Sequence, residues 1–183
     1  MKRLLISALA LLAGLVGQSA GAATIYLDPD NVRGLVGDVF SFDLYMDFEV
    51  ATSGMGSVSI QYESAVLGNA SFTYDPGFES SVFQTYDPNY GSGVIGNIGF
   101  YDVYGVSGLH RIGTLSLEAL APSDMSPLAV LEEASFITAD IYGDPISVDY
   151  SGAMVSIAAV PVPAAFWLMA SGLGLLAGWR RRG

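Results

Sequence analysis

The chain has 183 residues, of which 51% are hydrophobic and 14% charged, and this composition is typical of a folded protein and not of a disordered one. Its seven basic and 18 acidic residues give a formal net charge of −11, which argues against nucleic acid as a partner because phosphate binding needs Lys and Arg. It has no cysteine and a single histidine, His110, which excludes disulfides, thiolate ligands and a histidine-rich metal site.

Residues 1–22 have the three parts of a secretory signal peptide. A basic start is followed by an apolar stretch that is too short to cross a bilayer comfortably. Ala20 and Ala22 form a small-x-small cleavage site, so we expect the mature chain to start near Ala23. The alternative is an uncleaved N-terminal anchor, which the Gly- and Ser-rich flank of the site disfavours.

Residues 23–159 alternate apolar and polar side chains repeatedly and show no long helical pattern, which predicts one all-β domain. In the clearest strand, five apolar residues share one face: Phe40, Phe42, Leu44, Met46 and Phe48. The expected strands lie at or near 25–27, 40–48, 57–62, 66–73, 94–100, 115–117, 130–138, 146–150 and 155–157. Short strands at this spacing favour a two-sheet, jelly-roll or immunoglobulin-like sandwich of about nine strands. This body would be flanked by an N-terminal signal helix and a C-terminal transmembrane helix.

Local details of this body are also predicted. Val94, Ile98 and Phe100 are expected to share one face of a strand. Turn-forming residues predict turns at 30–31, at Gly34 and at 75–77, among others.

Four stretches of the body resemble cohesin domains. Residues 24–44 resemble the opening strands of a cohesin, and residues 56–67 resemble an alternating strand that ends in Tyr62-Glu63-Ser64-Ala65-Val66-Leu67. Residues 112–119 resemble a later strand that leads to a Pro/Ser loop, and residues 136–157 resemble the closing strands. The resemblance implies a nine-stranded jelly-roll sandwich, a fold shared with certain carbohydrate-binding modules. It is a hydrophobic pattern and not a chemical motif, so it identifies no dockerin-contacting side chain.

Catalytic chemistry is poorly supported. A hydroxyl nucleophile needs a base, and His110 is the single imidazole, placed at a strand start where an ordinary edge residue is expected. Among 18 acidic residues, carboxylate pairs arise by chance, and the adjacent Glu132 and Glu133 would point to opposite faces of a strand. We therefore predict that the protein is not an enzyme.

No cofactor is predicted, with calcium kept as a hypothesis. Asp28-Pro29-Asp30 starts like an EF-hand loop, but Arg33 stands where the loop needs Gly and Val39 where it needs Glu. The chain is therefore not a dockerin. Separate loops could still gather a calcium site from Asp28, Asp30, Asp140 and Asp144. The alternative for these carboxylates is a solvated acidic surface.

Five tyrosines gather in the Gly-rich stretch 74–104: Tyr74, Tyr86, Tyr90, Tyr101 and Tyr104. Their amphipathic rings suit stacking on sugar rings at a small entropic cost, and Tyr90, Tyr101 and Tyr104 are the candidate ligand contacts. Packing in the core or on edge strands is the alternative for most of the five.

Residues 160–183 form a second terminal signal. The motif residues are Val160, Pro161, Val162, Pro163 and Ala164. An apolar run of 16 residues ends at Trp179 and, as a helix, would be about 24 Å long against a hydrocarbon core of about 30 Å. Trp167 and Trp179 suit the membrane interfaces, and Arg180, Arg181 and Arg182 would stay in the cytoplasm.

The charge distribution fits export of the middle of the chain. Between residues 23 and 159, two basic residues, Arg33 and Arg111, stand against all 18 acidic ones, so this segment carries a net charge of −16 and no lysine. Cationic side chains, which resist translocation, are thus concentrated at the two termini.

The tail resembles the PEP-CTERM sorting signal of Gram-negative bacteria in its VPxPA-type variant, with motif, apolar helix and arginine cluster in the same order. Val162 stands where the name-giving motif has Glu. The resemblance implies that exosortase removes the tail near the motif and that the protein accompanies exopolysaccharide production. A plain C-terminal anchor with a Pro-rich linker is the alternative.

Together these features predict an exported, non-enzymatic protein with a binding or adhesion module. Its expected partners are the secretion machinery, exosortase, the membrane through a transient C-terminal helix, and a protein or an exopolysaccharide. It would pass through the inner membrane to the cell surface or extracellular matrix of a Gram-negative bacterium. The alternatives are a carbohydrate-binding module associated with exopolysaccharide, a purely structural biofilm-matrix component and, ranked last, an enzyme.

Overall fold

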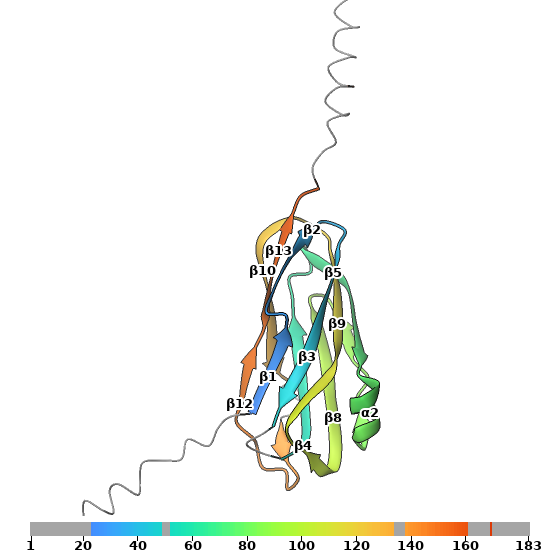
Figure 1. Ribbon diagram of the computed structural model, residues 1–183, viewed down its shortest axis with the longest axis vertical. Coiled ribbons are helices and arrows are strands. Elements are labelled where there is room, and N and C mark those ends of the chain that lie inside the picture. The colour runs from blue at the N-terminus through green and yellow to red at the C-terminus, as the bar shows by residue number, and fades with distance from the viewer. Residues whose placement is uncertain (1–22, 49–51, 134–137, 161–168, 170–183) are drawn as a thin grey trace, which may run out of the picture.

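The computed structural model describes residues 23–48, 52–133, 138–160 and 169, whose strands form a sandwich of two β-sheets (Figure 1). The first sheet contains β1 (Ala23–Asp28), β3 (Val39–Asp47), β5 (Leu67–Tyr74), β9 (Leu109–Ala119) and β12 (Val148–Ser151). The second sheet contains β2 (Asn31–Leu35), β4 (Ser53–Gln61), β6 (Gln84–Thr85), β7 (Asn89–Gly91), β8 (Val94–Val106), β10 (Ser123–Glu132), β11 (Ala139–Asp140) and β13 (Ala153–Ala158). The helix α2 (Pro76–Ser81) connects β5 to β6.

The strand order interleaves distant parts of the chain. The first sheet runs β12-β1-β3-β9-β5, and the second runs β2-β13-β10-β4-β8-β6, with β11 beside β4 and β7 beside β8. Pairing is antiparallel except for β1 with β12 and β2 with β13. These two parallel pairs lie where the chain passes from one sheet to the other, between β1 and β2 and between β12 and β13.

The core lies between the sheets and is built by the period-2 alternation of the strands. The five predicted apolar residues of the 40–48 strand are all buried. They face buried residues of the second sheet such as Val58, Ile60 and Phe100. Ring contacts extend this packing, since Phe100 meets Phe48 and Phe78 edge to face, with ring centroids 6.1 and 5.4 Å apart.

The all-β, two-sheet prediction is confirmed, whereas the strand number is higher than expected. The described residues contain 13 strands; eight of the nine expected ones coincide with a strand over most of their length, and the one expected over 130–138 overlaps β10 only at 130–132. The additional strands β2, β6, β7 and β11 have five, two, three and two residues. β2 occupies Gly34, where a turn was predicted, because β13 offers it a parallel partner from Met154 to Ala158. The turn predicted at 30–31 lies one residue earlier, at Pro29 and Asp30.

The turn predicted at 75–77 was wrong, because these residues begin α2. The side chain of Asp75 accepts hydrogen bonds from the backbone N–H groups of Gly77 (2.8 Å) and Phe78 (3.2 Å), and Pro76 occupies the first turn. An Asp-Pro pair is a turn signal and equally a helix-start signal. Burial of the Phe78 ring against the core favours the helix.

The prediction that Val94 shares a face with Ile98 and Phe100 was also wrong. Asn97 has a positive φ of 60°, and the pairing of β8 with β4 shifts register between Ile95 and Ile98. This irregularity turns Ile95 into the core in place of Val94. The strand expected over 130–138 ends at Glu132, and residues 134–137 lie outside the described residues.

The two ends of the sandwich are distinct. Ala23 begins β1 at the end where β3 finishes, since Thr24 pairs with Asp47, and Figure 1 shows this end at the bottom. Val160 leaves β13 at the opposite end, where Ala158 pairs with Leu35. We call the end that carries Ala23 the tip.

The predicted signal helix and tail helix fall outside the described residues, as do Ala20, Ala22, the motif after Val160, Trp167, Trp179 and the arginine cluster. Within the described ranges, the structure holds no helix with the length and apolar character needed to span a bilayer.

Candidate binding surface

The three candidate ligand tyrosines occupy different environments. Tyr90 lies in β7, and its hydroxyl accepts a hydrogen bond from the backbone N–H of Phe72 (3.1 Å), which ties the second sheet to β5. Tyr101 and Tyr104 lie near the end of β8 at the tip, and Tyr104 is 88% exposed. The structure therefore brings two of the three together and gives Tyr90 a structural contact.

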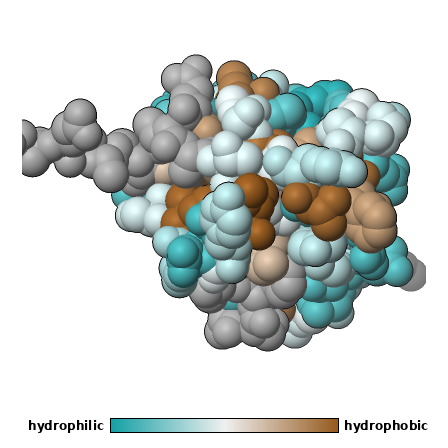
Figure 2. Space-filling model, turned by 90° about the horizontal axis from the view of Figure 1, so that it is seen from below, coloured by the Kyte–Doolittle hydropathy of each residue, from teal (hydrophilic) through white to brown (hydrophobic). Residues whose placement is uncertain are grey.

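Further exposed apolar and aromatic side chains join them at the tip. Phe83, 70% exposed, contacts Tyr101 edge to face at 6.1 Å, and Tyr142, 84% exposed, follows β11. We define the tip surface as Phe83, Tyr101, Val103, Tyr104, Ile141 and Tyr142. Figure 2 views this end and shows strongly apolar residues exposed among hydrophilic neighbours. Exposed apolar patches of this kind often mark interaction sites.

The carboxylate of Asp102 holds two of these residues in place. It is only 8% exposed, and its Oδ2 atom accepts a hydrogen bond from the backbone N–H of Phe83 (3.0 Å). Its Oδ1 atom accepts from the N–H groups of Tyr104 (2.8 Å) and Gly105 (2.9 Å). Gly105 has a φ of +80°, which lets the chain turn there. Asp102 thus fixes the backbone beneath Phe83 and Tyr104.

Asp140 does the same for the loop that follows β11. Its Oδ1 atom accepts from the backbone N–H groups of Tyr142 (2.8 Å) and Asp144 (2.9 Å). Gly143 turns the chain with a φ of +87°. A Cβ on Gly54 would lie 2.8 Å from the carbonyl oxygen of Asp140, so only glycine lets this loop pack directly against β4.

The irregular part of β8 and the loop after β11 share a sequence pattern that is visible in the sequence alone. Residues 102–105 read Asp-Val-Tyr-Gly and residues 140–143 read Asp-Ile-Tyr-Gly, and each shows a carboxylate-bound turn with a positive-φ glycine and an exposed tyrosine. They are neighbours because β4 pairs with both strands, Met55 lying opposite Tyr101 on one side and Ala139 on the other. A search for repeated four-residue patterns would have found them, but not their proximity.

A cavity of about 380 Å³ lies between the two turns. Its walls include Tyr101, Asp102 and Val103 from β8, and Asp140, Ile141 and Tyr142 from the other turn. Cavities of this size suit a small ligand or a side chain of a partner. Its described walls carry two carboxylates and no basic group.

The two cationic side chains of the body are placed elsewhere. Arg111 pairs with Asp75 and, through Nη1, with Asp43 at 3.4 Å. This contact, chiefly the hydrogen bond between the two side chains, lowers the pKa of Asp75 and raises that of Arg111. Arg33 lies in β2 opposite Ser156, near the end where Val160 leaves.

The four aspartates proposed for calcium do not gather in one place. Asp28 and Asp30 lie at the β1–β2 connection, where the carbonyl of Asp30 accepts from the N–H of Met154 (2.8 Å), whereas Asp140 and Asp144 form the turn at the tip. Among the described residues, no three His, Asp or Glu side chains are arranged to hold a metal ion. Calcium binding stays a prediction.

The residues weighed for catalysis have ordinary contacts. His110 lies at the start of β9, where its Nε2 atom is 2.9 Å from the carbonyl of Ser107 and its ring contacts Phe78. The side chain of Glu133 lies 3.4 Å from the backbone N–H of Asn97. Neither His110 nor Glu133 is thus paired with a nucleophilic side chain in these contacts.

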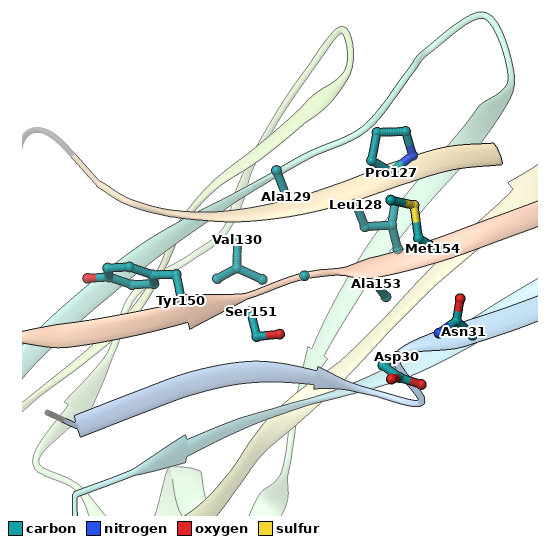
Figure 3. Close-up of a pocket in the computed structure, with 11 residues that line it drawn as sticks. Asp30, Asn31, Pro127, Leu128, Ala129, Val130, Tyr150, Ser151, Ala153 and Met154 are labelled. Carbon is teal, nitrogen blue, oxygen red and sulfur yellow. The ribbon is translucent and has the colours of Figure 1, made fainter. Parts of the chain in front are cut away.

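A second cavity, of about 450 Å³, opens between β10 and β12 (Figure 3). It exists because the chain pairs with β10 only from Ala153 onward, opposite Leu128, whereas the preceding strand β12 pairs with β1. Figure 3 shows Val130 and Tyr150 along it, with Asp30 and Asn31 at its far end. Burial raises the pKa of Tyr150. Among these walls, Asp30 is the sole ionisable carboxylate, so this cavity offers less chemistry than the one at the tip.

Comparison with known proteins gives the fold. No protein-family model and no curated protein matches the chain. The chain is similar to the cohesin CaCohA2 from Clostridium acetobutylicum, solved in complex with CaDoc0917. The TM-score is 0.61 and the identity 18%, over 74% of this chain and 99% of that one. A type I cohesin–dockerin complex from Clostridium thermocellum matches at 0.59 and 14% identity, over 75% and 100% of the two chains. A non-cellulosomal cohesin from the archaeon Archaeoglobus fulgidus matches at 0.58 and 16%, over 80% and 96%. The expected cohesin-like sandwich is thus confirmed as a fold.

Proposed function

We propose that this chain is an exported, non-enzymatic binding module that contacts a partner protein through its tip surface. One observation carries the proposal: two segments of matching sequence, held by Asp102 and Asp140, display Tyr104 and Tyr142 at 88% and 84% exposure. Rings whose backbone is already fixed lose little entropy on binding. The fold supports this reading, since several solved cohesins of the same fold were determined in complex with dockerins.

Export and sorting are part of the proposal. The acidic, lysine-free body and the signal-like termini support secretion, exosortase processing and a final place at the surface or in the extracellular matrix of a Gram-negative bacterium. Val160 leaves the sandwich at the end opposite the tip. While the tail is held in the inner membrane, the tip surface would therefore point away from the bilayer toward its partner.

The binding proposal is tested by site-specific photo-crosslinking in producing cells. A photoreactive residue at position 104 or 142 should capture a defined protein, identified by mass spectrometry and then shown to bind when purified. The matched control is position 71, since Ser71 is exposed on the outer face of the first sheet. Capture that is equal at position 71, or is absent at all three positions, would contradict the proposal.

The same samples separate the alternatives. Cross-links to polysaccharide alone would favour a carbohydrate-binding module that accompanies exopolysaccharide. A lack of any cross-link, together with weakened biofilm cohesion on deletion, would favour a structural matrix component.

Sorting has its own test. Mass spectrometry of the mature protein should show a start near Ala23 and loss of Arg180–Arg182 in a host with exosortase. An intact C-terminus in that host would refute processing without affecting the binding proposal.

A further inference from the structure

The cavity between the two tip turns combines aromatic rings with negative charge. Tyr101 and Tyr142 line it from β8 and from the turn after β11, and Asp102 and Asp140 belong to the same walls. Both oxygens of Asp102 accept backbone hydrogen bonds, so this buried group supplies charge and no free acceptor. Asp140 uses only Oδ1 for its backbone bonds, and its Oδ2 atom has no donor among the described residues.

No positive charge of the body compensates these carboxylates. Arg111 is paired with Asp43 and Asp75, and Arg33 lies in β2 near the opposite end. The body as a whole carries a net charge of −16. Such a cavity repels an anionic ligand and attracts a cation, most strongly where the surrounding protein excludes water.

We propose that this cavity receives the guanidinium or ammonium group of an arginine or lysine side chain presented by the partner protein. The flat rings of Tyr101 and Tyr142 provide cation–π contacts, and Oδ2 of Asp140 accepts a charge-assisted hydrogen bond. This inference rests on the proposed function and adds the chemistry of the partner, which is a basic polypeptide segment. Charge distinguishes this occupant from a neutral sugar, which would gain nothing from two uncompensated carboxylates.

The test uses the full-length protein in neutral detergent and two acetylated nonapeptides, one alternating Gly and Arg and the other alternating Gly and citrulline. Citrulline has nearly the shape of arginine without its charge. Calorimetric titration should show binding of the arginine peptide at least about tenfold tighter than that of the citrulline peptide. The preference should decline as salt rises from low to physiological concentration.

Variants locate the effect. Asp140→Asn keeps an acceptor for the turn and removes the charge, and it should weaken the arginine peptide at least about fivefold. Tyr142→Ala should weaken binding similarly, whereas Tyr142→Phe, which keeps the ring face, should not. Asp124→Asn is the control, since it removes one equal charge from β10 near the opposite end and should leave affinity unchanged.

Three results would overturn the inference. The first is equal affinity for the two peptides, and the second is a loss of affinity in Asp124→Asn as large as that in Asp140→Asn. The third is binding of neutral oligosaccharides that depends on Tyr142, without any preference for the arginine peptide. Failure of both peptides to bind, while position 104 still cross-links to a protein, would overturn the basic-partner inference alone and leave the proposed function intact. If no position cross-links to a protein but the arginine peptide still binds specifically, the proposed function is contradicted, whereas the inference that the cavity binds a cationic side chain is supported.

Discussion

Asp102 and Asp140, which are 38 positions apart in the sequence, share one contact: each Oδ1 accepts the backbone N–H of the tyrosine two residues further on, at 2.8 Å in both cases. Each carboxylate then accepts a second N–H at 2.9 Å. The two tyrosines thus share an aspartate contact on either side of β4, Tyr104 in an irregular part of β8 and Tyr142 in the turn after β11. A pair of rigid turns is better suited to recognition than loops that must be ordered on binding.

Removal of the Asp102 side chain should destabilise the fold. Asp102→Ala leaves three backbone N–H groups without their acceptor, so we expect the free energy of unfolding to fall by about 3 kcal/mol. Asp102→Asn keeps one oxygen acceptor and should cost about 1 kcal/mol. Urea unfolding measures both, with Asp124→Ala as a surface control expected within about 0.5 kcal/mol of wild type. An equal loss in the alanine and asparagine variants would show that the carboxylate is not the organising group.

The contact between Asp75 and Arg111 should make stability depend on acid pH. The hydrogen bond from Arg111 lowers the pKa of Asp75 below its ordinary value of 3.8, helped by the N–H groups of Phe78 and Gly77. A carboxyl whose folded-state pKa is depressed contributes stability above its unfolded-state pKa and loses it as pH falls through the folded-state value. We therefore expect this contribution to be complete above about pH 5 and to be lost below pH 3.8.

Carboxyl NMR titration measures this effect directly. In Arg111→Gln, the pKa of Asp75 should rise but stay below 3.8, because the two backbone donors of α2 remain. An unchanged pKa in that variant would show that α2 alone, and not the arginine, depresses it.

The sandwich could be predicted from the sequence because its strands obey one simple rule. In β3, each second side chain is buried, so Phe42 and Leu44 lie fully in the core exactly where their alternation places them. Deviations arise where a local contact overrides the rule. The positive φ of Asn97 shifts β8 and exchanges Ile95 for Val94, and a parallel partner turns 31–35 into a strand.

The tip surface could be predicted only in part, for a different reason. Tyr101 and Tyr104 stand out as members of the tyrosine-rich stretch 74–104. Phe83 lies in the same stretch but is not one of its tyrosines, and Tyr142 lies outside it. Their neighbourhood depends on the second sheet, in which β4 separates β8 from β11. Strand order of this kind is set by the whole core and is not encoded in any short segment.

Tyr74 should be a half-buried titrating group that reports on the contact between the sheets. Its hydroxyl donates to the carbonyl of Tyr86 (2.8 Å) and accepts from the N–H of Gly99 (2.9 Å), and burial raises its pKa to about 12. A group whose pKa is raised on folding contributes stability below its unfolded-state value of 10, and this is lost as pH rises toward 12. NMR titration of the ring should show the shift. Tyr74→Phe should cost about 1–2 kcal/mol in urea unfolding at pH 7, because it leaves the Gly99 N–H unpaired.

Glycine at 152 should be indispensable for the passage of the chain from β12 to β13. An ideal Cβ there would lie 1.8 Å from the carbonyl oxygen of Leu128, which is backbone in a paired strand and cannot move aside cheaply. We expect Gly152→Ala to lower the free energy of unfolding by about 3 kcal/mol or more.

Gly108→Ala is the matched control for this substitution. Gly108 has a positive φ of 83°, but a Cβ there would meet nothing within 4 Å, so the cost should be only that of the left-handed backbone, about 1 kcal/mol. Unfolding of both variants in urea compares a backbone clash with backbone strain alone. If Gly152→Ala proves no less stable than Gly108→Ala, the connection between β12 and β13 is not held in close contact with Leu128 of β10, and the cavity between β10 and β12 has a different origin from the one described.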